Sequence, residues 1–308
     1  MKTLPFSFYD AFTDNVFGGS QAAIVSDAAW IDSDTRQKIA CELGLPATCF
    51  IHDYSNNSVT VRFHSNEKEY PMCGHGTICL MTRMIEMGLL SWQGRERIDV
   101  QLHVGSATSV VEVFKREDGR AIVMLDIKPP KIENSAPDKQ NLATLLSINI
   151  DDYDEKLPIE IAYGDFIHLV VPVSDLDAMR RISPDFSGLK QFCIENSIDT
   201  VAVFCREVVQ SDYDIHVRDF CPAVGVAESA AAGTTNAALT GYLIRHEIVH
   251  EGGGKQLNIL AEQGLEMNRP SSIRSVVTMN DGTINRLQVG GVATKILDGN
   301  LYLPARAH

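Results

Sequence analysis

The chain has 308 residues, of which 44% are hydrophobic and 22% charged, the composition of a globular protein with a sizeable core. Its formal net charge of −13, without a block of lysines or arginines, argues against nucleic acid and anionic membranes as partners. Seven cysteines without regular spacing favour free thiols, and the N-terminus lacks the apolar core of a signal peptide, so we expect a cytoplasmic protein.

The first part of the chain is predicted to alternate strands with two helices. Asp32 offers an N-cap and Gly44 a stop for a helix over 34–43. A glycine turn opens a longer helix over about 74–90, whose apolar run is too short and too interrupted to span a bilayer and is typical of a buried helix. Strands are predicted over 6–12, 22–25, 48–52, 58–63, 98–104, 109–114 and 121–127.

A loss of hydrophobicity separates the first part of the chain from the second. Two consecutive prolines, Pro129 and Pro130, and the polar residues 133–140 mark a domain boundary. We therefore expect domains over 1–128 and 129–308, with the last strands able to return to the first domain. The second is predicted to contain a short helix over 175–182, an apolar helix over about 233–250, and strands over 166–173, 201–206, 213–220, 257–262, 272–279, 283–289 and 293–296.

The two halves repeat one another. Each has a strand with Arg-Phe or Arg-Asp-Phe (Arg62-Phe63 and Arg218-Asp219-Phe220), then a loop and a glycine-led buried helix. A period of half the chain is a signature of duplication. The pattern predicts an α+β protein of two pseudo-symmetric lobes, each with strands wrapped round one apolar helix. If a pseudo-twofold relates the lobes, both helix starts can face one inter-lobe cleft, a favoured place for a small ligand.

The start of each apolar helix is a candidate site. Free backbone N–H groups at a helix start attract anions, and such a position lowers the pKa of a thiol. In the first half Cys73 stands there, with His75 two residues on; in the second, Gly233, Thr234 and Thr235 do. A small packed residue remains the alternative for Cys73, as does a capping or ring-packing role for His75.

Four stretches resemble the PhzF-like family of phenazine-biosynthesis isomerases, within the superfamily of diaminopimelate epimerase and proline racemase. They are Asp10-Ala11-Phe12-Thr13 with Phe17-Gly18-Gly19-Ser20, the run 69–77, the run 225–238, and Gln263-Gly264 with 267–271. The resemblance implies two lobes, each a curved antiparallel sheet wrapped round a central helix. Dimers are common in that family, which implies that this chain can form a homodimer.

Several positions depart from the family pattern. Ala47 stands where the family usually has a catalytic glutamate, and Ser229 where the second signature usually carries an acid. Ala232 stands where the cofactor-independent racemases have a second cysteine, whereas Cys73 and His75 match. Neither full acid–base set is therefore present.

The resemblance implies a cofactor-independent isomerase or epimerase that moves a proton alpha to the carboxylate of a small amino or hydroxy acid. Cys73 and His75 would be catalytic, without cofactor or metal. The substrate-binding residues would be Gly74, Gly76, Ser20, Gln21, Ser229, Gly233, Thr234 and Thr235. For the serines, threonines and Gln21, helix capping or turn formation remains the alternative.

Two other functions stay open. One is a single-base dehydratase of a 3-hydroxy amino acid, which needs only one proton acceptor. The other is a catalytically inactive family member that binds a small metabolite, which the substitutions at Ala47, Ser229 and Ala232 favour.

A rival motif lies at the end of the second apolar helix. The run His246-Glu247-Ile248-Val249-His250 matches H-E-x-x-H, in which two histidines on one helix face bind zinc. Here it precedes three glycines, and no further helix plainly supplies a third ligand. Histidines in a last turn also suit the helix dipole, so the structural interpretation is favoured over zinc.

Overall fold

The computed structural model describes residues 2–135, 137–249, 256–280 and 282–304. The chain divides into two compact units. The first unit comprises Met1–Leu125 with Gly290–His308, and the second Asp126–Val289. No helix among the described residues combines the length and hydrophobicity needed to cross a bilayer.

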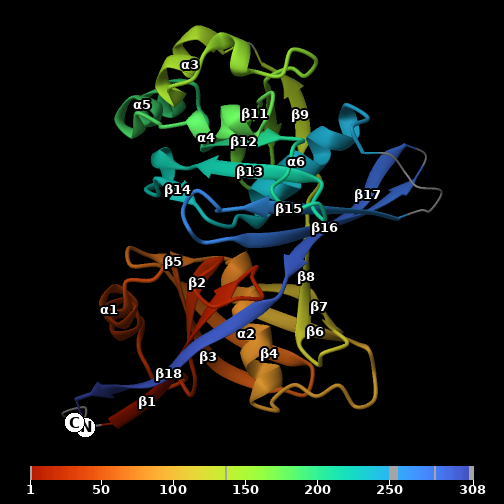
Figure 1. Cartoon of the computed structure of the whole chain (residues 1–308). Coiled ribbons are helices and arrows are strands. Elements are labelled where there is room, and N and C mark those ends of the chain that lie inside the picture. The colour runs from red at the N-terminus through yellow and green to blue at the C-terminus, as the bar shows by residue number, and fades with distance from the viewer. Residues whose placement is uncertain (1, 136, 250–255, 281, 305–308) are drawn as a thin grey trace. The chain divides into compact units, whose positions relative to one another are not determined.

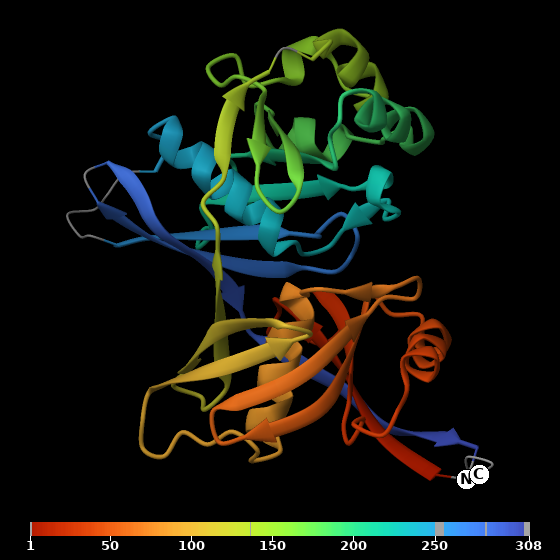
Figure 2. The same cartoon turned by 180° about the vertical axis from the view of Figure 1, so that it is seen from behind.

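The first unit is a curved sheet around one helix. Helix α2 (Gly74–Glu86), orange in Figures 1 and 2, lies inside the curve of the strands, whereas α1 (Ser33–Leu43) lies outside it. The last strand, β18 (Ala293–Leu303), returns to this unit and pairs with β1 (Lys2–Ala11). The other strands are β2 (Ser20–Val25), β3 (Ala47–Ser55), β4 (Ser58–His64), β5 (Glu69–Tyr70), β6 (Arg97–Val104), β7 (Ala107–Lys115) and β8 (Ala121–Ile127).

Local sequence explains both helices. Asp32 accepts a hydrogen bond from the backbone N–H of Thr35, and Gly44 ends α1 in the left-handed region, as predicted. Along α2 the side chains of Leu80, Met81 and Met84 are fully buried, and each contributes about 1.5–3 kcal/mol by leaving water. The prediction was wrong at the far end of α2, which stops at Glu86 rather than near residue 90.

The second unit has helices on both faces of its sheet. Side chains of β11 (Ile167–Pro172) alternate: Leu169 and Val171 join the core under α3, α4 and α5, whereas Val170 joins the core around α6. The helices are α3 (Lys139–Leu146), α4 (Leu176–Arg181), α5 (Phe186–Glu195) and α6 (Gly233–Arg245), with short 3₁₀ turns at Ile150–Asp152 and Pro222–Val224. The other strands are β9 (Lys131–Asn134), β10 (Glu160–Tyr163), β12 (Thr200–Cys205), β13 (Ile215–Phe220), β14 (Glu228–Ser229), β15 (Gln256–Gln263), β16 (Ser271–Asn280) and β17 (Thr283–Gly291).

Strand pairing reproduces the internal repeat. In the first unit β2–β3 and β4–β6 are parallel, and β3–β4, β4–β5 and β6–β7 are antiparallel. In the second unit β11–β12 and β13–β15 are parallel, and β12–β13, β13–β14 and β15–β16 are antiparallel. The predicted α+β class with two similar lobes is confirmed. The expected antiparallel sheets differ in one respect: each sheet also contains parallel pairs, because a helix in the connection turns the chain back parallel.

Helix α6 begins at Gly233 as predicted but ends at Arg245, short of residue 250. His246 bonds Glu160 at 2.7 Å and packs against the Tyr242 ring, with centroids 4.4 Å apart. Glu247 takes a positive φ of 53°, so the H-E-x-x-H run leaves helical geometry at its second residue. His250 lies outside the described residues.

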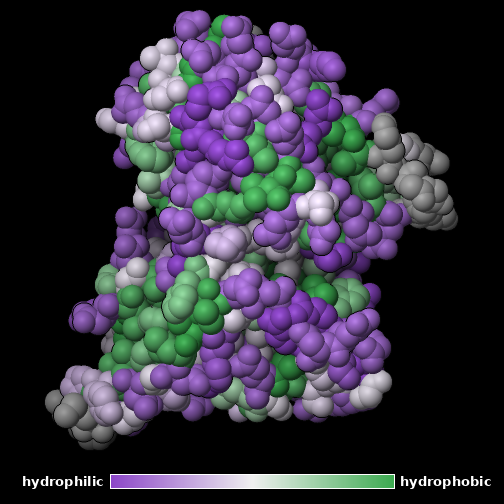
Figure 3. Space-filling view, viewed as in Figure 1, coloured by the Kyte–Doolittle hydropathy of each residue, from purple (hydrophilic) through white to green (hydrophobic). Residues whose placement is uncertain are grey.

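Hydrophilic residues cover much of the face in Figure 3, with hydrophobic patches between them. Large apolar side chains with at least two-fifths of their area exposed include Val16, Phe17 and Met72. The first two belong to the loop between β1 and β2, and the third precedes α2.

Candidate active site

The start of α2 leaves its backbone N–H groups without a side-chain cap. Cys73 takes the N-cap position with extended backbone (φ −145°, ψ 107°), and its side chain caps nothing. Its carbonyl instead accepts from the backbone N–H of Thr77 at 2.9 Å and from the Thr77 hydroxyl at 2.8 Å. An uncapped helix start of this kind suits an anion.

The thiol of Cys73 contacts the imidazole of His75. The sulfur lies 3.7 Å from both Nδ1 and Nε2, so it faces the ring rather than one nitrogen. Burial raises the pKa of the Cys73 thiol to about 12, against the opposing effect of the Gly76 N–H, and burial lowers the pKa of His75 to about 4. The sequence-based expectation that the helix start lowers the thiol pKa is therefore wrong here, because loss of hydration outweighs it. Both groups are neutral at pH 7.

Gly76 makes room for this pair. A Cβ built on Gly76 would lie 3.0 Å from the Cys49 sulfur, 3.1 Å from the Cys73 sulfur and 3.3 Å from the Phe63 ring. The Cys49 thiol donates to the Gly76 carbonyl at 3.5 Å. Burial also raises the pKa of Cys49. The absence of a side chain at Gly76 thus lets three buried groups meet at the helix start.

The loop before β2 has a constrained backbone. Phe12 and Phe17 both have positive φ, at 64° and 68°, and the carboxylate of buried Asp10 accepts from the Phe17 N–H at 2.8 Å. Non-glycine residues in this region tend to mark functional sites. Ser20 and Gln21 follow, partly exposed, as the first residues of β2. This strand packs against α2.

The start of α6 repeats the backbone of the start of α2. Ala232 is the N-cap with φ −133° and ψ 111°, again without a capping side chain. Gly233 and Thr234 are partly exposed. Asn236 donates to the Gln263 side-chain oxygen at 2.9 Å, and Gln263 in turn donates to the Ser229 carbonyl at 2.8 Å. These bonds tie Ser229 to the first turn of α6.

The second helix start also contains buried residues that the sequence reasoning missed. The Thr235 hydroxyl is fully buried and donates to Asp219 Oδ2 at 2.9 Å, so only its backbone N–H remains for a ligand. His168 Nδ1 lies 2.7 Å from the Thr200 hydroxyl and 3.5 Å from that of Thr235. A strict alignment of the two halves at Arg62 and Arg218 would have revealed Asp219 opposite Phe63.

Burial sets the protonation states of Asp219 and His168. Burial raises the pKa of Asp219 to about 6, although interactions with the Thr235, Cys221 and Thr200 side chains oppose the rise. It lowers the pKa of His168 to about 4. At pH 7 Asp219 is therefore mainly ionised and His168 neutral.

Ala47, where the resemblance places a glutamate, is fully buried at the start of β3 and pairs with Ala22. It brings no acid to the first helix start. No group of three His, Cys, Asp or Glu side chains suited to a metal occurs in the described part of the chain.

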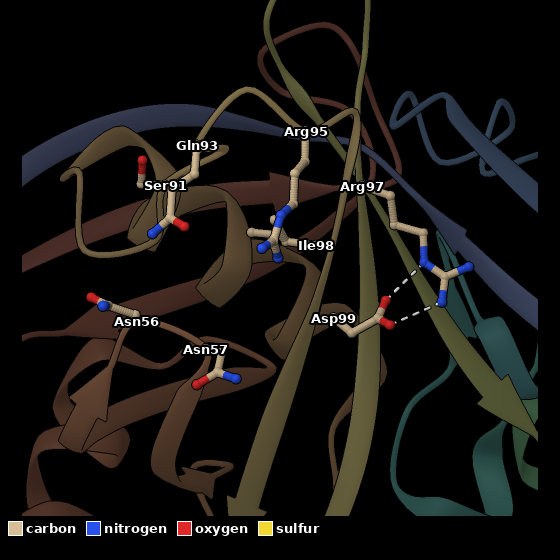
Figure 4. A pocket seen from close by; sticks show the side chains of 8 residues that line it. All are labelled: Asn56, Asn57, Ser91, Gln93, Arg95, Arg97, Ile98 and Asp99. Atoms are coloured by element: carbon tan, nitrogen blue, oxygen red, sulfur yellow. Dashed lines mark hydrogen bonds and ion pairs between the residues drawn. The ribbon is translucent and has the colours of Figure 1, made fainter.

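A hollow of about 560 Å³ lies in the first unit (Figure 4). Asn56 and Asn57 line it from the β3–β4 turn, and Arg97 and Asp99 from β6. Arg97 bonds Asp99 at 2.8 and 3.0 Å, as the dashed lines show, and Glu112 at 2.9 Å. Arg97 is thus already neutralised, and none of the residues predicted for catalysis or binding lines the hollow.

The chain matches the family described as phenazine biosynthesis-like protein, PhzC–PhzF, over residues 9–299. An uncharacterized isomerase of Mesorhizobium japonicum is 28% identical over 98% of this chain and 100% of its own length. The trans-2,3-dihydro-3-hydroxyanthranilate isomerase of Pseudomonas aeruginosa is 25% identical over 96% of this chain and 98% of its own.

Solved structures share the fold. A PhzF-family protein of Bacillus anthracis has a TM-score of 0.86 at 23% identity, covering 98% of this chain and 100% of its own. A hydroxyproline epimerase from Agrobacterium vitis with bound trans-4-OH-L-proline has a TM-score of 0.60 at 14% identity, covering 97% and 92%. The chain therefore belongs to the family of phenazine biosynthesis-like proteins, and its enzyme class is that of an isomerase.

Proposed function

We propose that this isomerase moves a proton alpha to the carboxylate of a small amino or hydroxy acid, without a cofactor, using Cys73 and His75. The observation that carries the proposal is the contact of a neutral thiol with a neutral imidazole, 3.7 Å apart, at an uncapped helix start. The bound hydroxyproline of the epimerase with the same fold supports the substrate class.

The substrate carboxylate would bind the backbone N–H groups of Gly74 to Gly76, which also stabilise the charge that builds on it as the α-proton leaves. His75, neutral at pH 7, would accept the α-proton. The Cys73 thiol, or a water held by Thr234, would then return a proton to the substrate carbon, and the imidazolium would restore whichever group gave it. A bound anion raises the pKa of His75, which makes it a better base than in the free protein.

The second helix start enters this proposal as a further binding element. Gly233, Thr234 and Ser229 offer backbone and hydroxyl donors to the substrate. That both helix starts serve one substrate stays a prediction from the sequence. Substitution of Thr234 tests it, because Thr234→Val would then raise KM for the same acids that depend on Cys73.

Solvent exchange measures the proposed proton transfer directly. Both enantiomers of a panel of amino and hydroxy acids are incubated in deuterium oxide, and the α-hydrogen signal is followed by NMR. We expect Cys73→Ser and His75→Gln each to slow exchange by about 10²–10⁴-fold. The matched controls Cys41→Ser, at an exposed thiol, and His103→Gln should exchange as the parent does. Unchanged exchange in the first two variants would refute these roles.

Ala232 favours a second candidate, a single-base dehydratase. The position equivalent to Cys73 holds no ionisable group in the second unit, and elimination needs only one base. A 3-hydroxy amino acid would lose water to give an enamine, which hydrolyses to a keto acid and ammonia. Ammonia release with loss of the β-hydroxyl would identify this reaction, whereas an inverted stereocentre would identify epimerisation. Thermal stabilisation by an acid that is never turned over would instead identify an inactive binding protein.

A further inference from the structure

The two helix starts correspond residue by residue, so their differences can be located. Phe63 pairs with Tyr70 in the first unit, as Asp219 pairs with Ser229 in the second. Arg62 binds Glu69 beside the first pair, as Arg218 binds Glu228 beside the second. Asp219 thus takes the place of Phe63, and Thr235, third residue of α6, takes that of Gly76.

The replacement of apolar by polar residues extends to the neighbouring strands. Ala22 pairs with Ala47 in the first unit, whereas His168 pairs with Thr200 in the second. An apolar wall beneath the start of α2 is therefore replaced by four polar residues beneath the start of α6: His168, Thr200, Asp219 and Thr235. A polar cluster that is 96% or more buried requires partners for all its groups.

Asp219 has such partners at one of its two carboxylate oxygens and not at the other. Its side chain is 1% exposed, and Oδ2 accepts from Thr235 at 2.9 Å and from the Cys221 thiol at 3.2 Å. Oδ1 makes no hydrogen bond to the described residues. The neighbouring cation, Arg218, is held by both oxygens of Glu228, each at 2.9 Å. A buried carboxylate with one free oxygen and no cation is costly unless a ligand supplies both.

Ser229 lies directly across the strand pair from Asp219. Side chains of directly opposite residues point to the same face of a sheet. Ser229 is partly exposed, and the segment from it to α6 consists of Ala230, Ala231 and Ala232, whose methyl groups fill little space. The side of Ser229 is therefore the route that a small donor would take to Asp219.

We propose that Asp219, with Ser229, binds the ammonium group of an amino-acid substrate, an inference that rests on the isomerase function proposed above. The ammonium supplies the missing positive charge and a donor for Oδ1. A hydroxy acid supplies a donor without the charge, so the site selects amino acids over hydroxy acids.

The protonation of the cluster agrees with this assignment. The Cys221 thiol bonds Asp219, and His168 contacts the Thr200 and Thr235 hydroxyls of the same cluster. Both are neutral at pH 7, because burial lowers the pKa of His168 and raises that of Cys221. Glu228 is paired with Arg218. Asp219 is left as the ionised group that faces the ligand, and amine binding should weaken as the pH falls below about 6.

Matched pairs of acids test the inference by binding alone. Alanine and lactate, serine and glycerate, aspartate and malate, and phenylalanine and phenyllactate differ only in the amino or hydroxyl group. Calorimetry on the full chain should show at least a tenfold preference for the amino member of one pair, lost in Asp219→Asn. The exposed Asp165→Asn is the matched control and should keep the preference. Ser229→Ala should reduce it without affecting folding.

The outcomes separate this inference from the proposed reaction. If Cys73→Ser still prefers the amino acid while exchange is lost, both proposals stand. If no acid exchanges its α-hydrogen but the preference depends on Asp219, the isomerase proposal falls and the ammonium site stands. If the preference survives in folded Asp219→Asn, or no member of any pair binds, the ammonium site is refuted and a water fills the place at Oδ1.

If Asp219→Asn does not fold, the wild-type protein supplies the second test. Its preference for the amino acid should fall at least threefold between pH 7.5 and 5, as Asp219 takes up a proton. A preference that does not change over this range would overturn the inference.

Discussion

At the start of α2 the chain buries a thiol and an imidazole around Gly76, whereas at the start of α6 it buries a carboxylate around Thr235. The backbones are alike, with N-cap φ and ψ of −145° and 107° against −133° and 111°. The side chains are exchanged in compensating pairs. The large Phe63 stands with glycine in one unit, and the smaller Asp219 with threonine in the other. Duplication thus conserved the helix start and left the wall beneath it free to change its chemistry.

The comparison extends to the strand after each helix. Thr60 pairs with His103 between β4 and β6, whereas His216 pairs with Glu262 between β13 and β15. His216 is fully enclosed, with Nδ1 2.7 Å from Glu262 and Nε2 2.8 Å from Glu266. The second unit therefore concentrates buried charge at positions where the first has neutral or solvent-exposed groups.

Substitution of one residue of a compensating pair should lower the free energy of unfolding most. Gly76→Thr gives position 76 the residue found at the equivalent position, Thr235. Its side chain would collide with Cys49, Cys73 and Phe63. We expect a loss of about 3 kcal/mol in the free energy of unfolding, measured by urea denaturation. Gly74→Ala is the control, because its Cβ would meet only Leu125 at 3.7 Å. Equal stability of the two variants would show that the helix starts are interchangeable.

Loss of one hydrogen bond in the second unit should lower the free energy of unfolding by less. Thr235→Val removes the hydroxyl that donates to Asp219 and should lower the free energy of unfolding by about 1–3 kcal/mol. The loss should be greater at pH 8 than at pH 5, because Asp219, with its pKa raised to about 6, is ionised only at the higher pH. Thr234→Val removes a partly exposed hydroxyl and should lower the free energy of unfolding by less at both pH values. A loss that does not vary with pH would contradict the ionised state of Asp219.

The smallest effect is expected from the titration of His216. Burial lowers its pKa, but hydrogen bonds with Glu266 and Glu262 outweigh burial and leave the pKa above 6.5. Its contribution to stability is therefore complete below pH 6.5 and is lost as the pH rises through the folded-state pKa. His216→Gln should flatten the decline in unfolding free energy above pH 6.5. His103→Gln, at the equivalent strand pair, should leave the decline as it is; identical pH profiles for wild type and His216→Gln would refute the protonated state.

Much of the fold could be predicted because its signals are local. The caps at Asp32 and Gly44, the apolar run after Gly74 and the glycine turn before Thr234 each fix a helix end through nearby backbone bonds. The short strands β5, β9, β10 and β14 were not predicted, since two to four residues carry too little alternation. Helices α3 and α5 were not predicted either, although Asp138 and Asp185 cap them. Only a few residues of each are buried, so the helical spacing of apolar residues is weak.

The sequence by itself determined the repeat, the two helix starts and the position of Cys73 and His75 at the first of them. Residues two apart do not share a helix face, so the contact between the thiol and the imidazole was decided by the tertiary structure. Only the tertiary structure decided what those starts do chemically. Burial raises the pKa values of Cys73 and Asp219 against the trend of the helix dipole and lowers that of His75 along with it, and burial is a property of the assembled core. Strand register joins His168, Thr200, Asp219 and Thr235 from four separate elements, which no local pattern could indicate.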